Sequence, residues 1–130
     1  MEIIEDNEID VNTLCLNLAL FKPYSTCMIQ SSTDEDAKKV IKTISKTIDM
    51  LKELMDDAFY MSFPLNNTKH ELTFKNGSKI ISTIIDENRA RGRTIDILVI
   101  NDSVDNISES YMTAILPALS AVGGKFIVTD

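Results

Sequence analysis

The chain has 130 residues, of which 44% are hydrophobic and 25% are charged, and its net charge at pH 7 is −7. This length suits one domain with its own core and leaves no room for two. The acidic balance argues against tight non-specific binding to nucleic acid, because phosphate contacts need Lys and Arg. The only dense basic cluster is Arg89, Arg91 and Arg93.

The chain shows no secretory signal, and no stretch approaches the roughly 20 apolar residues of a membrane helix. We therefore expect a cytoplasmic protein, in a cell or an infected host. Cys15 and Cys27 lack the CxxC spacing of a metal or redox site and are predicted to be buried apolar residues. His70 is the sole histidine and is predicted to lie in a surface loop, so no metal site is expected.

The first half of the chain predicts a short strand at residues 1–4, a buried helix over 13–21 and a buried strand over 26–30. A longer amphipathic helix follows, with apolar residues three and four apart from Ala37 to Met55. Ser32 and Glu35 have the spacing of a capping box at its start.

The second half predicts one β-hairpin over residues 71–85, because Asn76-Gly77 is typical of a type I′ turn. A charged loop then leads to a buried strand, "IDILVI". The last helix is predicted to start at Ser108 and to be kinked or ended early by Pro117. Gly123-Gly124 stops it before a final strand, "KFIVTD". Strands alternating with helices predict a three-layer α/β domain over residues 1–130, with a mostly parallel sheet.

Four linked motifs resemble a known family. They are "CMIQSST", "FKNGSKI", "ARGRTIDILVIND" and "AILPALSAVGGK" followed by "IVTD". In this order they resemble the ATPase core of the large terminase subunit, the DNA-packaging motor protein of tailed phages and related viruses. The resemblance covers almost the whole chain. It implies a P-loop-type fold and ATP hydrolysis that drives DNA into a procapsid. We expect the protein in the host cytoplasm or in the virion, with a viral packaging or virion component as its partner.

The chain departs from that family where phosphate should bind. The resemblance implies a Gly-rich loop with a Lys between the first strand and the first helix. The segment there, "EDNEIDVN", has neither, and it carries the carboxylates of Glu5, Asp6, Glu8 and Asp10. Asp10, Asn12 and Thr13 are therefore interpreted as a degenerate nucleotide loop. We expect no cofactor, and ATP with Mg²⁺ only if this interpretation is wrong.

The polar pair that follows the strand "IDILVI" also differs from the pattern of that family. Asn101 falls where the resemblance implies a metal-holding Asp, and Asp102 falls where it implies the Glu that orients the attacking water. Thr129 falls at the position that couples hydrolysis to movement. A buried strand also often ends in Asn or Asp simply to cap the following turn. ATP hydrolysis by this chain alone is therefore not expected.

Three functions remain open from the sequence. The first is a terminase-like pseudo-ATPase that acts through protein–protein contacts in packaging or virion assembly. In this case Arg89, Arg91 and Arg93 would contact a neighbour's phosphate site or an acidic patch. The alternative for these arginines is a solvated loop without a binding role. The second is one piece of a split packaging motor that another chain completes. The third is a small acidic binding protein or DNA mimic. A protein partner is expected, and neither nucleic acid nor a membrane.

Overall fold

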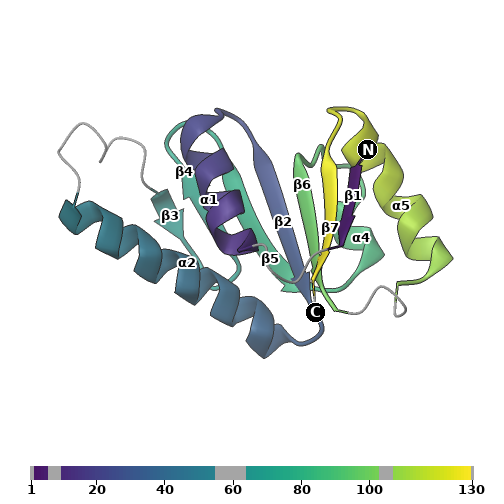
Figure 1. Ribbon diagram of the computed structural model, residues 1–130, viewed down its shortest axis with the longest axis horizontal. Coiled ribbons are helices and arrows are strands. Elements are labelled where there is room, and N and C mark those ends of the chain that lie inside the picture. The colour runs from purple at the N-terminus through teal and green to yellow at the C-terminus, as the bar shows by residue number, and fades with distance from the viewer. Residues whose placement is uncertain (1, 6–9, 55–63, 103–106, 130) are drawn as a thin grey trace.

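The computed structural model describes residues 2–5, 10–54, 64–102 and 107–129. These residues form one sheet flanked by helices on both faces (Figure 1). Its strands are β1 (Glu2–Glu5), β2 (Thr26–Ser31), β3 (Pro64–Asn67), β4 (Glu71–Phe74), β5 (Lys79–Ile84), β6 (Ile97–Asn101) and β7 (Lys125–Thr129). Its helices are α1 (Val11–Phe21), α2 (Asp34–Leu54), α4 (Glu87–Ala90) and α5 (Glu109–Ser120).

The sheet has the strand order β1-β7-β6-β2-β5-β4-β3. Strands β1, β7, β6, β2 and β5 are parallel to one another, while β4 and β3 join antiparallel at one edge. The parallel strands all end at the bottom of Figure 1, where α2 also begins. This shared end is called the C-terminal edge below, and the opposite end is called the N-terminal edge.

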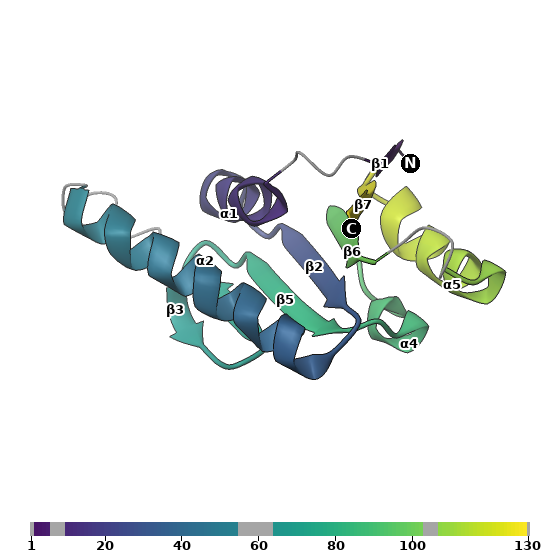
Figure 2. The same ribbon diagram turned by 60° about the horizontal axis from the view of Figure 1, so that its bottom comes forward.

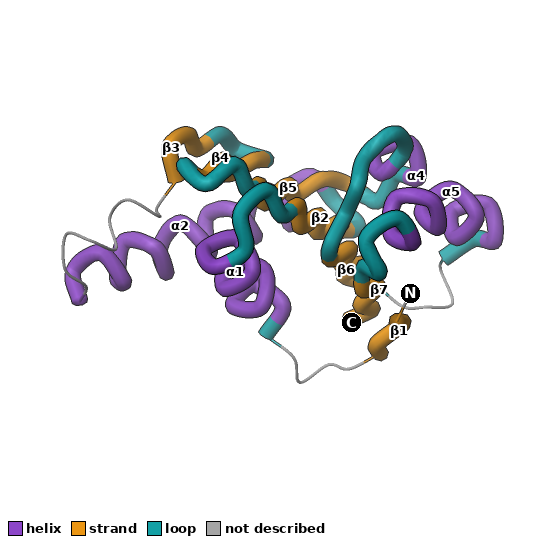
Figure 3. Tube along the Cα trace, turned by 90° about the horizontal axis from the view of Figure 1, so that it is seen from above, coloured by secondary structure: helices purple, strands orange, loops and turns teal. Residues whose placement is uncertain are grey.

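The helices divide into two layers. Helices α1 and α2 cover one face and α4 and α5 cover the other, as Figures 2 and 3 show from two directions. The side chains of β6 alternate accordingly, since Ile97 and Val99 pack in the core beneath α1 and α2 while Leu98 and Ile100 pack beneath α5. The prediction of a three-layer α/β fold with a mostly parallel sheet is confirmed.

The antiparallel edge differs from its prediction in two ways. The hairpin of β4 and β5 is present, but only Gly77 has a positive φ (86°), so the turn is not of type I′. The N–H of Gly77 donates to the Phe74 carbonyl and the N–H of Phe74 donates to the Ser78 carbonyl, which describes a three-residue loop closed by a left-handed glycine. Strand β3, which the sequence did not suggest, adds a second antiparallel pairing.

Three local predictions need correction. Helix α2 is capped by Thr33 and not by Ser32, because the hydroxyl of Thr33 accepts the N–H of Asp36 at 3.1 Å. The charged loop contains the short helix α4 after Asp86. Pro117 lies inside α5 and does not end it, whereas the predicted cap at Ser108 is confirmed by its bond from the Tyr111 N–H.

Cys15 and Cys27 are fully buried free thiols, as predicted. The hydrogen bond with Cys15, followed by burial, raises the pKa of the Cys27 thiol. Within the described parts of the chain, none of the helices has both the length and the apolar character to cross a membrane.

Candidate functional site

A chain of polar side chains joins the C-terminal ends of three neighbouring strands. The hydroxyl of Thr129 on β7 donates to Asn101 Oδ1 on β6 at 2.7 Å. Asn101 Nδ2 in turn donates to the hydroxyl of Ser31 on β2 at 3.4 Å. Ser31 and Thr129 are buried and Asn101 is partly buried. The three groups satisfy one another at the edge where α/β sheets usually bind ligands.

The strand register places these residues side by side. Asn101 is paired with Ser31 on one side and with Thr129 on the other. Its side chain lies on the same face as Ile97 and Val99, which is the face covered by α1 and α2. Two of the three residues, Asn101 and Thr129, were predicted from the sequence.

Ser31 was not predicted as a site residue. Its signal is weak, because "QSST" after a buried strand also looks like an ordinary turn. The pairing of the three strand ends identifies it. That pairing joins Ser31 to Asn101 across 70 positions and Asn101 to Thr129 across 28 positions, which a sequence pattern does not contain.

The start of α1 holds Asp10, Asn12 and Thr13, the residues interpreted from the sequence as a degenerate nucleotide loop. Asp10 is the N-cap residue, and its carboxylate accepts the N–H of Thr13 at 3.2 Å and the hydroxyl of Thr13 at 2.8 Å. The side-chain bond from Thr13, then its backbone bond, lower the pKa of Asp10. Asn12 Oδ1 is buried and makes no hydrogen bond with a described residue. Glu5, Asp6 and Glu8 lie where the structure describes no side chains.

These contacts bear on phosphate binding at α1. The N–H and hydroxyl of Thr13 are the donors that a phosphate at this helix end would need, and a carboxylate already accepts both. A second anion beside that carboxylate would be repelled by about 1–4 kcal/mol per unit charge, against about 0.3–1 kcal/mol from the helix N-terminus. At this helix end the N–H and the hydroxyl of Thr13 are therefore already engaged by Asp10.

Asp102 follows Asn101 immediately after β6 and is partly buried. It is therefore at the C-terminal edge, beside the polar chain of Ser31, Asn101 and Thr129. Across the part of the chain that the structure describes, no three His, Cys, Asp or Glu side chains gather as a metal site would require.

The arginine cluster lies in the other helical layer. Arg89 is in α4, 3.7 Å from the Asp86 carboxylate, and Arg93 Nε donates to the Arg89 carbonyl at 3.1 Å. Arg91 and Arg93 line a groove against α5. Asn101 points toward the α1 and α2 layer, so the structure places the arginines and the strand-end residues on opposite faces of the sheet.

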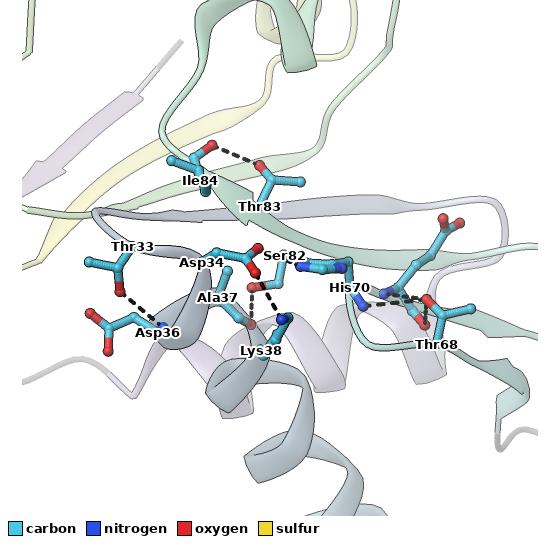
Figure 4. Close-up of polar contacts among 11 residues, drawn as sticks. Thr33, Asp34, Asp36, Ala37, Lys38, Thr68, His70, Ser82, Thr83 and Ile84 are labelled. Carbon is cyan, nitrogen blue, oxygen red and sulfur yellow. Dashed lines mark hydrogen bonds and ion pairs between the residues drawn. The ribbon is translucent and has the colours of Figure 1, made fainter.

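A further polar cluster surrounds the start of α2 (Figure 4). Asp34 accepts from Lys38 at 2.9 Å and contacts His70 at 2.8 Å, and these two bonds lower its pKa. His70 comes from the β3–β4 connection, so the loop position predicted for it is confirmed and the ion pair is new. Ser82 on β5 donates to the Ala37 carbonyl at 2.7 Å. The cluster fastens α2 to the antiparallel edge.

Comparisons with known proteins give a structural likeness. No family model and no curated protein matches the chain. Its structure is similar to the large terminase ATPase domain of Thermus phage P74-26, with a TM-score of 0.70 and 16% identity over 98% of this chain. It is also similar to the large terminase from the thermophilic bacteriophage D6E in complex with ADP, with a TM-score of 0.63 and 15% identity over 98% of this chain.

The likeness concerns the fold. The chain spans 58% of the P74-26 domain and 33% of the D6E protein. At these identities the architecture of the large terminase ATPase domain is established for this chain, and the chemistry of those proteins is not.

Proposed function

We propose that this chain is a terminase-like protein of a phage or virus that does not hydrolyse ATP by itself and acts through protein contacts in DNA packaging or virion assembly. The fold supports the terminase-like part. The observation that carries the pseudo-ATPase part is the carboxylate of Asp10, which accepts both donors of Thr13 at the start of α1.

The strand ends support the same proposal. A metal-dependent site at this edge would use a carboxylate at the end of β6, because Mg²⁺ prefers charged oxygen ligands. Asn101 is neutral, and both ends of its amide are engaged by Thr129 and Ser31. Binding a metal through Asn101 Oδ1 would compete with the hydrogen bond from Thr129.

Nucleotide binding tests the proposal directly. The purified chain is titrated with a fluorescent ATP analogue and Mg²⁺, and its melting is followed with millimolar ATP. A ligand at a hundred times its dissociation constant would add about 2.7 kcal/mol of stability, which is readily measured. We expect neither binding nor a melting shift. Mg²⁺-dependent binding that is lost in Asp102→Ala would overturn the proposal and favour an active motor domain.

A second candidate is one piece of a split packaging motor. The chain spans 58% of the P74-26 ATPase domain, and β1 forms one edge of the sheet with a pairing to β7 alone among the described strands. A second chain that adds to this edge could complete the domain. This candidate predicts that ATP hydrolysis appears on mixing with that chain and is lost in Asp102→Ala.

The DNA-mimic alternative is less well supported. A mimic needs a stripe of carboxylates without intervening cations. The described acidic side chains near the start of α2 are interrupted by Lys38, whose ammonium is 2.9 Å from Asp34.

A further inference from the structure

The N-terminal edge of the sheet carries exposed apolar and cationic side chains that the proposed function does not use. Phe21 is 67% exposed, Tyr24 is 83% exposed and Val122 is 44% exposed. Lys22, Lys79 and Arg93 lie among them. These six residues are called the N-edge patch below.

Two grooves meet in the N-edge patch. One has a volume of about 440 Å³ and is lined largely by apolar residues, among them Leu14, Leu18, Phe21 and Val122. The other has a volume of about 400 Å³ and is lined by Tyr24 with the cations Lys22, Lys79 and Arg93. Both grooves include Lys22, Asp96 and Val122, so the apolar groove and the groove lined by cations adjoin at these residues.

Tyr24 has an unusual backbone conformation beside the β4–β5 turn, where its N–H donates to the Asn76 carbonyl at 3.2 Å. Its φ is +59°, which makes it the one non-glycine residue with positive φ in the described chain. Such a backbone costs about 1–3 kcal/mol and suits Gly or Asn better. The ring lies over Gly77, where an added Cβ would come within 2.5 Å of Tyr24 Cδ1. The contact with Gly77 and the hydrogen bond to Asn76 hold an exposed aromatic ring at the N-terminal edge of the sheet.

The charges of the N-edge patch differ in how far they are neutralised. Lys22 binds the Asp96 carboxylate at 2.8 Å, and Lys79 is 3.7 Å from Glu71. Arg93 forms no ion pair with a described residue. Lys125 adds a further cation beside the apolar groove. The N-edge patch is therefore positive although the whole chain has a net charge of −7.

We propose that the N-edge patch binds an acidic protein segment in which one or two apolar side chains lie among Asp and Glu. The apolar groove accepts the apolar side chains, Tyr24 covers them, and the cations bind the carboxylates. A nucleic acid fits less well, since its phosphates and bases would leave the aliphatic groove unfilled. The proposal does not depend on whether the chain hydrolyses ATP.

The test is a selection in which a display library of random short peptides is enriched for binding to the immobilised wild-type chain. The enriched peptides are then synthesised and their affinities are measured. We expect acidic peptides with Leu, Ile or Phe. Replacing those apolar residues by Ser should weaken binding about tenfold, and Arg93→Glu should weaken it by a similar factor. Lys42→Glu, on the exposed side of α2, is the matched control and should bind as the wild type does.

Tyr24→Asn separates binding from folding, because Asn tolerates the positive φ. We expect binding to fall about tenfold while the melting temperature stays the same or rises by a few degrees. Tyr24→Phe should retain binding. Selection of no peptide, selection of basic peptides, or peptide binding unchanged in both Tyr24→Asn and Arg93→Glu would overturn the proposal. Tighter binding of single-stranded oligothymidylate at the same residues would overturn it in favour of a nucleic-acid site.

Discussion

The two ends of the parallel strands use polar residues in opposite ways. At the C-terminal edge, Ser31, Asn101 and Thr129 bond to one another. At the N-terminal edge, Tyr24 is 83% exposed and Arg93 has no ion pair among the described residues. A ligand at the first edge must break internal hydrogen bonds, whereas a ligand at the second meets an exposed aromatic ring and an arginine that has no ion pair among the described residues. The resemblance to the terminase ATPase core points to the first edge as the functional site, whereas the binding that we propose lies at the second.

The largest expected loss of stability comes from a substitution at the N-terminal edge of the sheet. A Cβ on Gly124 would lie 2.5 Å from the Ile95 carbonyl oxygen, a backbone atom that cannot move alone. Gly124→Ala should therefore lower the free energy of unfolding by about 2–3 kcal/mol. Denaturant titration measures this loss.

The neighbouring Gly123 gives a control for backbone strain. It has a φ of +63°, but a Cβ added there would meet no atom within 4 Å. Gly123→Ala should cost only the strain of a left-handed residue, about 1 kcal/mol. Equal losses in Gly123→Ala and Gly124→Ala would show that the contact with Ile95 does not matter.

A smaller effect is expected when the polar chain at the C-terminal edge is broken. Thr129→Val keeps the shape of the side chain but leaves Asn101 Oδ1 without its 2.7 Å donor. The free energy of unfolding should fall by about 1–2 kcal/mol, because a partly buried acceptor loses its partner.

Thr47→Val serves as the control for Thr129→Val, since its hydroxyl bonds the Thr43 carbonyl on an exposed part of α2. It should change stability by less than about 0.5 kcal/mol. If Thr129→Val is equally mild, the strand ends are not held by this hydrogen bond.

The smallest expected effect concerns pH at the start of α1. Bonds from Thr13 hold the pKa of Asp10 below its ordinary value of 3.8 in the folded chain. A depressed folded pKa means that the contribution is present above the unfolded pKa and is lost as pH falls through the folded pKa. Asp10→Asn should remove this part of the acid dependence below about pH 4 and still cap the helix.

NMR titration of the Asp10 carboxyl carbon measures that pKa, and melting from neutral pH to pH 3 measures the linked stability. Asp49→Asn, on an exposed part of α2, is the control. A titration midpoint of Asp10 at or above 3.8 would contradict its hydrogen bonds with Thr13.

The sequence by itself determined most of the parallel core. Apolar runs such as Ile97–Ile100 predict buried strands because both faces of a covered sheet are dry. The spacing from Ala37 to Leu51 predicts α2 because an amphipathic helix must repeat its apolar face. Asn101 and Thr129 were singled out because the motifs that contain them resemble the ATPase core of the large terminase subunit.

Tertiary structure alone decided which polar groups meet. Ser31 joins Asn101 through strand register, and Lys22 meets Asp96 across 74 positions of sequence. The positive φ of Tyr24, the cap at Thr33 and the added strand β3 were likewise missed. Strand pairing and turn geometry are set by contacts between distant segments, and these contacts cannot be predicted from local sequence patterns.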